Sequence, residues 1–139
     1  MPRLSLDIEY DFEFLLVGIS CHEKDYRICW ALNKQLNIEL ARQDDLEIKE
    51  KKQMDVSRHA LFSWADEENF IEYSFIANRS SQGLLLPEQK QADYLMKVSG
   101  NLSAKQKEQI LSDIKSIPIV LTSFSINPTS LKSKQNLVF

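Results

Sequence analysis

The sequence predicts an α+β fold, in which a largely antiparallel sheet carries two helices on one of its faces. Two segments, 20–36 and 103–116, begin with capping-box residues and continue with apolar residues at helical spacing. Segments 4–14, 60–64 and 71–77 alternate apolar and polar residues with the period of a β-strand. The order strand, helix, several strands, helix, strand favours a ferredoxin-like or ACT-like arrangement.

Length and composition describe a single α+β domain over residues 1–139. The chain is 43% hydrophobic and 27% charged, and at this size about two-thirds of the unfolded surface can be buried. The net charge of −3 opposes a general affinity for nucleic acid or anionic membrane. We expect no signal peptide and no membrane span, because the apolar run 14–19 is far shorter than the roughly 20 residues that cross a bilayer. The expected location is the cytoplasm, with both cysteines reduced.

The first half is expected to contain a long strand, a helix and a second extended segment. Residues 4–14 predict a strand with a bend near 9–11, and residues 14–19 predict a strand buried on both faces, although helix remains an alternative for 11–20. A capping box at Ser20 and Glu23 predicts a helix from about Cys21 that ends at Asn37. Its predicted buried face contains Tyr26, Cys29, Trp30 and Leu36.

The second extended segment, residues 38–48, is expected to break at Asp44–Asp45, and the charged residues 49–55 are expected to form an exposed loop. The alternating runs 60–64 and 71–77 flank a polar turn at 66–69, which predicts a hairpin.

The last part of the chain is expected to form a strand, a helix and a strand. Pro87 suits the first position of a helical turn, and residues 94–98 predict a strand. Ser103 and Gln106 fit a second capping box, and Pro118 ends the helix that follows. Residues 119–126 predict the last strand.

Metal-binding and nucleophilic residues do not form a recognisable motif. The soft ligand types in the chain are Cys21, His22, Cys29 and His59, and they lack the close pairs of a zinc site. Cys21 and His22 are adjacent, so their side chains diverge on a helix, whereas a Cys21–His59 pair requires the fold to bring them together. The alternating carboxylates Asp7, Glu9, Asp11 and Glu13 are expected to form a solvated strand face rather than a cation site. We expect no metal, no cofactor and no catalytic residue.

Four aromatic residues on the predicted hairpin admit two interpretations. They are Phe62, Trp64, Tyr73 and Phe75. On an exposed sheet they would stack RNA bases, but the basic residues that flank such platforms are missing, so core packing is the favoured interpretation.

The segment Leu84–Gly100 carries the most specific pattern in the chain. Leu86-Pro87-Glu88 is followed after three residues by Ala92-Asp93-Tyr94. This pattern resembles the signature of the uncharacterised IPExxxVDY family of Bacteroidetes proteins, with Leu for Ile at 86 and Ala for Val at 92. Two further landmarks are similar to that family, and they lie at residues 25–33 and 131–139. The family has no established activity, so the resemblance implies no catalytic residue.

The signature and the C-terminal tail supply the candidate binding surface, which comprises Glu88, Asp93, Tyr94, Lys132, Lys134 and Phe139. A structural interpretation is favoured for the signature, with Glu88 in a first helical turn and Tyr94 buried with its hydroxyl bonded to backbone. The tail combines two lysines with an apolar end, so we expect Phe139 to anchor in a groove of the same chain or of a twin subunit.

These observations favour a non-enzymatic protein-interaction module that binds an unidentified protein partner. A homodimer formed through a sheet edge or a helix face is included in this prediction. The alternatives are an RNA-associated accessory protein and a small-molecule-binding, ACT-like regulator.

Overall fold

The computed structural model describes residues 13–49 and 56–139. The described strands pair mainly into one six-stranded sheet with the order β11-β2-β10-β7-β6-β3, in which every neighbouring pair is antiparallel. Its strands are β2 (Leu15–Ser20), β3 (Ala41–Arg42), β6 (Leu61–Asp66), β7 (Ile71–Ala77), β10 (Tyr94–Ser99) and β11 (Thr122–Ile126).

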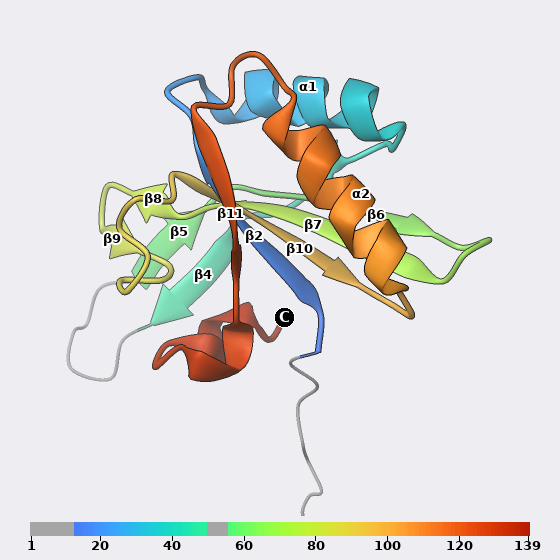
Figure 1. The fold of residues 1–139 in the computed structure, drawn as a ribbon. Coiled ribbons are helices and arrows are strands. Elements are labelled where there is room, and N and C mark those ends of the chain that lie inside the picture. Colours follow the sequence, from blue (N-terminus) through green and yellow to red (C-terminus); the bar gives the residue numbers. More distant parts are fainter. Residues whose placement is uncertain (1–12, 50–55) are drawn as a thin grey trace, which may run out of the picture.

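Two helices cover one face of this sheet (Figure 1). They are α1 (Asp25–Leu36) and α2 (Ala104–Lys115). The four strands β11-β2-β10-β7, with α1 following β2 and α2 joining β10 to β11, have the ferredoxin-like order. Strands β6 and β3 extend that sheet beyond β7. The α+β prediction, with a largely antiparallel sheet and two helices on one face, is therefore confirmed.

Smaller elements lie outside the main sheet. Two short ribbons pair β4 with β5 and β8 with β9, and two 3-10 turns follow β11. Their bounds are β4 (Leu46–Lys49), β5 (Val56–His59), β8 (Arg79–Ser80), β9 (Gly83–Leu84), η1 (Pro128–Ser130) and η2 (Lys134–Leu137).

The sheet is buried on both faces because its strands contribute alternate residues to two cores. On β10, Tyr94, Met96 and Val98 belong to the core beneath the helices, which also contains Ile28 of α1 and Ile114 of α2. The core on the opposite face contains Leu95, which lies between these residues on β10. The segment 85–92 and the C-terminal tail cover this core, and the tail contributes Leu131 and Leu137 to it. The tail and the segment 85–92 therefore cover much of the second face.

Local signals identified the helix ends correctly in two places. Ser103 accepts a hydrogen bond from the Gln106 backbone, and the Gln106 side chain accepts one from the Ser103 N–H, so the predicted capping box is confirmed. Asn37 ends α1 in the left-handed conformation with φ of 57°.

The predicted capping box at Ser20 is wrong. Helix α1 begins at Asp25 after the N-cap residue Lys24, and the Ser20 hydroxyl donates instead to the Gln91 carbonyl at 2.6 Å. The predicted buried face is also partly wrong, because Tyr26 and Trp30 are exposed while Cys29 is buried. Ile28 and Leu32, neither of which belongs to the predicted face, form the buried stripe with Cys29.

The strands predicted at 60–64, 71–77 and 94–98 are present with bounds that differ by at most two residues at either end. The question of strand or helix is resolved as strand for β2, and the predicted hairpin is β6–β7. The break at Asp44–Asp45 separates β3 in the main sheet from β4 in a ribbon. The last strand begins at Thr122 rather than at residue 119. The alternating segment 4–14 lies outside the described residues apart from its last two positions, and so does most of the loop 49–55.

Candidate functional site

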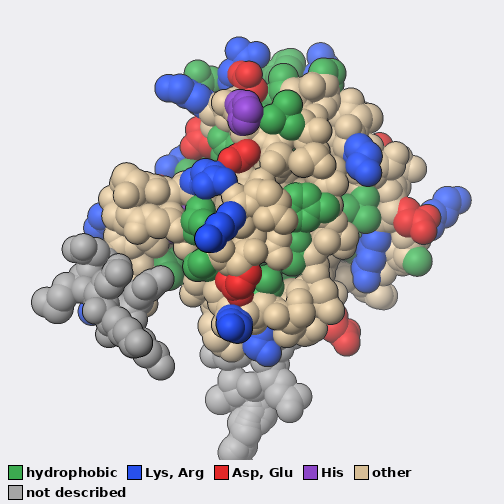
Figure 2. Space-filling model, turned by 60° about the vertical axis from the view of Figure 1, so that its left-hand side comes forward, with side chains coloured by type: hydrophobic (Ala, Val, Ile, Leu, Met, Phe, Trp, Pro, Cys, Tyr) green, Lys and Arg blue, Asp and Glu red, His purple; other side chains and the backbone are tan. Residues whose placement is uncertain are grey.

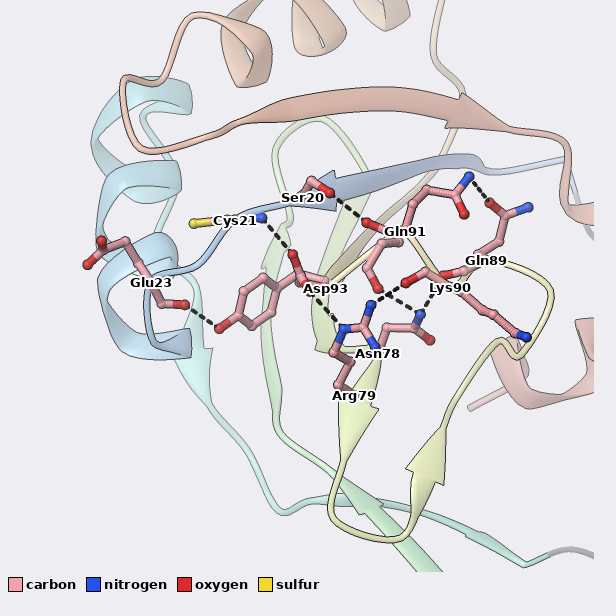
Figure 3. A network of polar contacts seen from close by, with 11 residues as sticks. Ser20, Cys21, Glu23, Asn78, Arg79, Gln89, Lys90, Gln91 and Asp93 are labelled. Atoms are coloured by element: carbon pink, nitrogen blue, oxygen red, sulfur yellow. Dashed lines mark hydrogen bonds and ion pairs between the residues drawn. The ribbon is translucent and has the colours of Figure 1, made fainter.

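Asp93 is the centre of a polar network that joins the start of α1 to the segment before β10 (Figure 3). Its carboxylate accepts a hydrogen bond from the Cys21 backbone N–H at 2.9 Å and one from the Arg79 guanidinium Nε at 2.8 Å. Arg79 also donates to the Lys90 carbonyl. Because the Asp93 backbone N–H donates to the Ile19 carbonyl at 2.9 Å, the residue is held from both its side chain and its main chain.

The side chain of Asn78 forms hydrogen bonds to the backbone of the signature segment. It is fully buried, and its side-chain amide donates to the carbonyls of Gln89 and Ala92 at 3.0 and 2.8 Å, while its oxygen accepts from the Leu86 N–H at 2.8 Å. An asparagine directly after an alternating strand resembles a turn residue, so the sequence pattern does not single Asn78 out. Its three side-chain bonds show that it shapes the loop between β9 and β10.

Tyr94 fulfils the structural interpretation of the signature. Its side chain is 9% exposed and stacks on Phe75, with ring centroids 5.1 Å apart. Its hydroxyl donates to the Glu23 carbonyl at 2.6 Å, which fastens the loop before α1. Burial, assisted by the carboxylate charge of Asp25 and neighbouring groups, raises the pKa of Tyr94 to about 12. The hydroxyl therefore stays protonated and serves as a donor at neutral pH.

Glu88 connects the signature segment to the C-terminal tail. Its carboxylate accepts hydrogen bonds from the Ser133 backbone N–H at 2.9 Å and from the Ser133 hydroxyl at 2.6 Å. Burial alone would raise the pKa of Glu88, but these hydrogen bonds outweigh it and lower the pKa below the ordinary value. The predicted turn at Pro87 and Glu88 is present, closed by the bond from the Gln89 N–H to the Leu86 carbonyl, but no helix continues from it.

The tail docks on its own chain, but Phe139 is not its anchor. Leu137 is fully buried, whereas Phe139 is 47% exposed. The Lys97 ammonium of β10 donates to the Leu137 carbonyl at 2.8 Å and lies 4.8 and 4.5 Å from the ring centroids of Phe14 and Phe139. Burial lowers the pKa of Lys97. The tail is therefore held by the buried side chains of Leu131 and Leu137, by the hydrogen bonds between Glu88 and Ser133, and by the Lys97 ammonium, over which the Phe139 ring lies.

The six residues of the predicted binding surface do not form one site. Asp93 and Tyr94 face the start of α1. Glu88 contacts the tail, on which Lys132 is exposed and Lys134 is half-buried. The structure assigns most of these side chains to holding loops and tail in place.

A polar cleft of about 710 Å³ opens beside the Asp93 network. Three arginines line it, and each is paired with a carboxylate. The ion pairs are Arg42–Asp45, Arg58–Glu47 at 3.3 Å and Arg79–Asp93 at 2.8 Å. On the face shown in Figure 2, basic and acidic side chains are interspersed rather than gathered by sign. The cleft therefore presents no net excess of positive charge for an anion.

The thiol and imidazole groups lack the properties of an activated pair. Burial raises the pKa of both thiols, that of Cys29 to about 11, so both are protonated at neutral pH. His59 is fully buried, and its ring nitrogens contact the Ala77 carbonyl at 2.9 Å and the Ser57 hydroxyl at 3.0 Å. Burial lowers its pKa. Within residues 13–49 and 56–139, no three His, Cys, Asp or Glu side chains gather into a group suited to a metal ion.

A second concavity is apolar and lies between α1 and the loop that joins α2 to β11. This α1 groove has a volume of about 590 Å³ and is lined by Tyr26, Arg27, Trp30, Ala31, Ile117, Pro118 and Ile119. Tyr26 is 62% exposed and Trp30 is 64% exposed. They are four residues apart, so both project from one side of the helix. The ammonium of Lys34 lies 5.0 Å from the Trp30 ring centroid.

No protein-family model, no curated protein and no solved structure matches the chain. The resemblance to the IPExxxVDY proteins therefore stays a prediction. No helix within the described part of the chain is both long enough and apolar enough to span a bilayer.

Proposed function

We propose that this protein is a non-enzymatic protein-interaction module and that the α1 groove is its docking site. The supporting observation is the pair Tyr26 and Trp30, two large aromatic side chains that stay mostly exposed beside an apolar concavity. Tyrosine and tryptophan are the residue types that dominate binding energy at protein interfaces. An exposed apolar groove of this kind is typical of a surface that a partner covers.

Charge next to the groove indicates the chemistry of the partner. Arg27 lines the groove and Lys34 lies over Trp30, so two cations border the aromatic pair. A partner segment with an apolar anchor residue and an adjacent carboxylate complements this arrangement. Arg27 already pairs with Glu23 at 3.1 Å, but both side chains are well exposed and such a pair contributes little, so it can exchange for a partner carboxylate.

The RNA alternative loses its main support. Phe62, Tyr73 and Phe75 are buried in the core beneath the helices, and Trp64 packs against the same core. The opposite sheet face is covered by the C-terminal tail. The aromatic residues of the hairpin are thus occupied in packing rather than presented for stacking.

The test is a quantitative affinity purification from the native cell extract. It compares the parent protein with Trp30→Ala and with Phe70→Ala, a matched control that removes another exposed aromatic, 82% accessible, from the β6–β7 hairpin. The proposal predicts a partner that the parent and Phe70→Ala retain equally and that Trp30→Ala loses at least tenfold. Equal retention by Trp30→Ala, or selective recovery of RNA, would refute it.

A further inference from the structure

The two edges of the main sheet differ in how they are protected. Strand β3 has two residues, and the Arg42 guanidinium donates to the carbonyls of Gln43 and Leu61 at 2.7 and 3.3 Å along that edge. Strand β11 has five residues, Thr122–Ile126, and contains neither a charged residue nor a proline. Short length, charge and proline are the usual devices that prevent an edge from pairing with another chain. The β11 edge has none of them.

Two residues at β11 also lack contacts within the described part of the chain: an apolar side chain is exposed, and a buried hydroxyl has no hydrogen-bond partner. Leu121, immediately before the strand, is 62% exposed. The Ser123 hydroxyl is buried and has no hydrogen-bond partner among the described residues. A buried hydroxyl without a partner is uncommon in a native structure and calls for an explanation. On the same face of the strand, Ser125 is exposed.

We propose that a second copy of this chain pairs antiparallel with β11 about a two-fold axis at Phe124, so that two six-stranded sheets become one. The strand order ends at β11 among the described residues, which leaves one side of this strand open to a partner strand (Figure 1). Two-fold pairing is self-complementary and is the commonest symmetry of homo-oligomers.

The register follows from the symmetry. With Phe124 on the axis, the two Phe124 side chains are direct cross-strand neighbours, and Ser123 lies opposite the partner's Ser125. Directly opposed serines in an antiparallel pair are within hydrogen-bonding reach. Because its own chain covers the Ser123 hydroxyl, this bond forms when the hydroxyl rotates toward the open edge, and the same bond then forms a second time across the axis.

This inference goes beyond the proposed function and does not depend on it. The α1 groove is lined by α1 and by residues 117–119, whereas the pairing uses residues 122–126. A dimer joined at β11 carries two grooves, so a partner with two binding segments would be held more tightly than by one groove. The dimer and the docking site at the α1 groove can therefore be refuted separately.

The experiment is sedimentation velocity on the full chain from low to high micromolar concentration. We expect a dimer that dissociates on dilution, since a five-residue edge makes a small interface. Ser125→Lys and Thr122→Lys each place a charge on the exposed edge and are expected to be monomeric throughout the range. Ser81→Lys adds the same charge at the exposed β8–β9 turn and is expected to dimerise like the parent. Melting temperatures verify that both edge variants are folded.

Three results would overturn the proposal. A parent protein that is monomeric at every concentration excludes the pairing. A dimer that persists unchanged in both edge variants places the contact elsewhere. A further variant, Ile8→Lys, changes the alternating segment outside the described residues and is expected to leave the dimer intact. Loss of the dimer in Ile8→Lys would assign the contact to that segment and contradict pairing between two β11 strands.

Discussion

Replacing Tyr94 by alanine removes both a buried ring and a hydrogen bond to the loop before α1. The ring is 9% exposed, stacks on Phe75 at 5.1 Å, and carries the hydroxyl that donates to the Glu23 carbonyl at 2.6 Å. Truncating a buried aromatic to alanine costs about 3–5 kcal/mol. For a chain of this size each kcal/mol corresponds to roughly 3–4 °C, so the melting temperature is expected to fall by about 9–20 °C.

A second substitution at the same position separates the two contributions. Tyr94→Phe keeps the ring and removes the hydroxyl, which leaves the Glu23 carbonyl without this donor, and we expect a loss of about 1–2 kcal/mol. Tyr26→Ala is the matched control, because Tyr26 is 62% exposed and its truncation is expected to cost less than about 0.5 kcal/mol.

Urea denaturation followed by far-UV circular dichroism measures these free energies of unfolding. If Tyr94→Ala loses less than about 1 kcal/mol, or no more than Tyr26→Ala, the interpretation of the signature as a structural clamp is refuted.

Three further perturbations test separate parts of the structure. Leu137→Ala should cost about 2–4 kcal/mol because Leu137 is fully buried, whereas Val138→Ala, at a 39% exposed position, should cost under about 1 kcal/mol. Equal losses of stability in chemical denaturation would contradict the role of Leu137 as the anchor of the tail. Gly18→Ala should destabilise the protein by about 1–3 kcal/mol, since a Cβ would lie 2.5 Å from the Phe124 ring. Adding Phe124→Leu in the same chain should reduce that loss of stability, and an unreduced loss in the double variant would refute the clash. Burial raises the pKa of Cys29 from 9.0 to about 11, so the stability due to its neutral thiol is complete below pH 9 and is lost as the pH rises to about 11. Urea titrations from pH 9 to about 11 should show that the free energy of unfolding declines less in Cys29→Ala than in the parent. An identical decline in both proteins would exclude Cys29 as its source.

Features set by neighbouring residues could be predicted from the sequence. The Ser103–Gln106 capping box, the Asn37 helix end and the β6–β7 hairpin all depend on residues within a few positions of one another. The sequence also predicts that the buried Tyr94 hydroxyl bonds to backbone, but it does not identify the acceptor, which lies 71 positions away.

Features set by distant residues could not be predicted from local pattern. Ser20 has the residue type and spacing of a helix cap, but it donates to Gln91, which lies 71 positions away. The tail has three apolar residues at its end, and only the fold shows that Leu137 meets the core while Phe139 rests over Lys97. Likewise, only the fold shows that Trp30 and residues 117–119 line the same groove.

Site-specific photo-crosslinking in the native cell tests the central claim most directly. A photoreactive amino acid at position 26, inside the α1 groove, is compared with the same group at position 70 on the β6–β7 hairpin. Mass spectrometry of the adducts identifies the class of molecule that is captured. The account predicts one protein adduct of defined mass at position 26 that is absent at position 70 and disappears when Trp30→Ala is added. Adducts to RNA, or identical adducts at both positions, would contradict it.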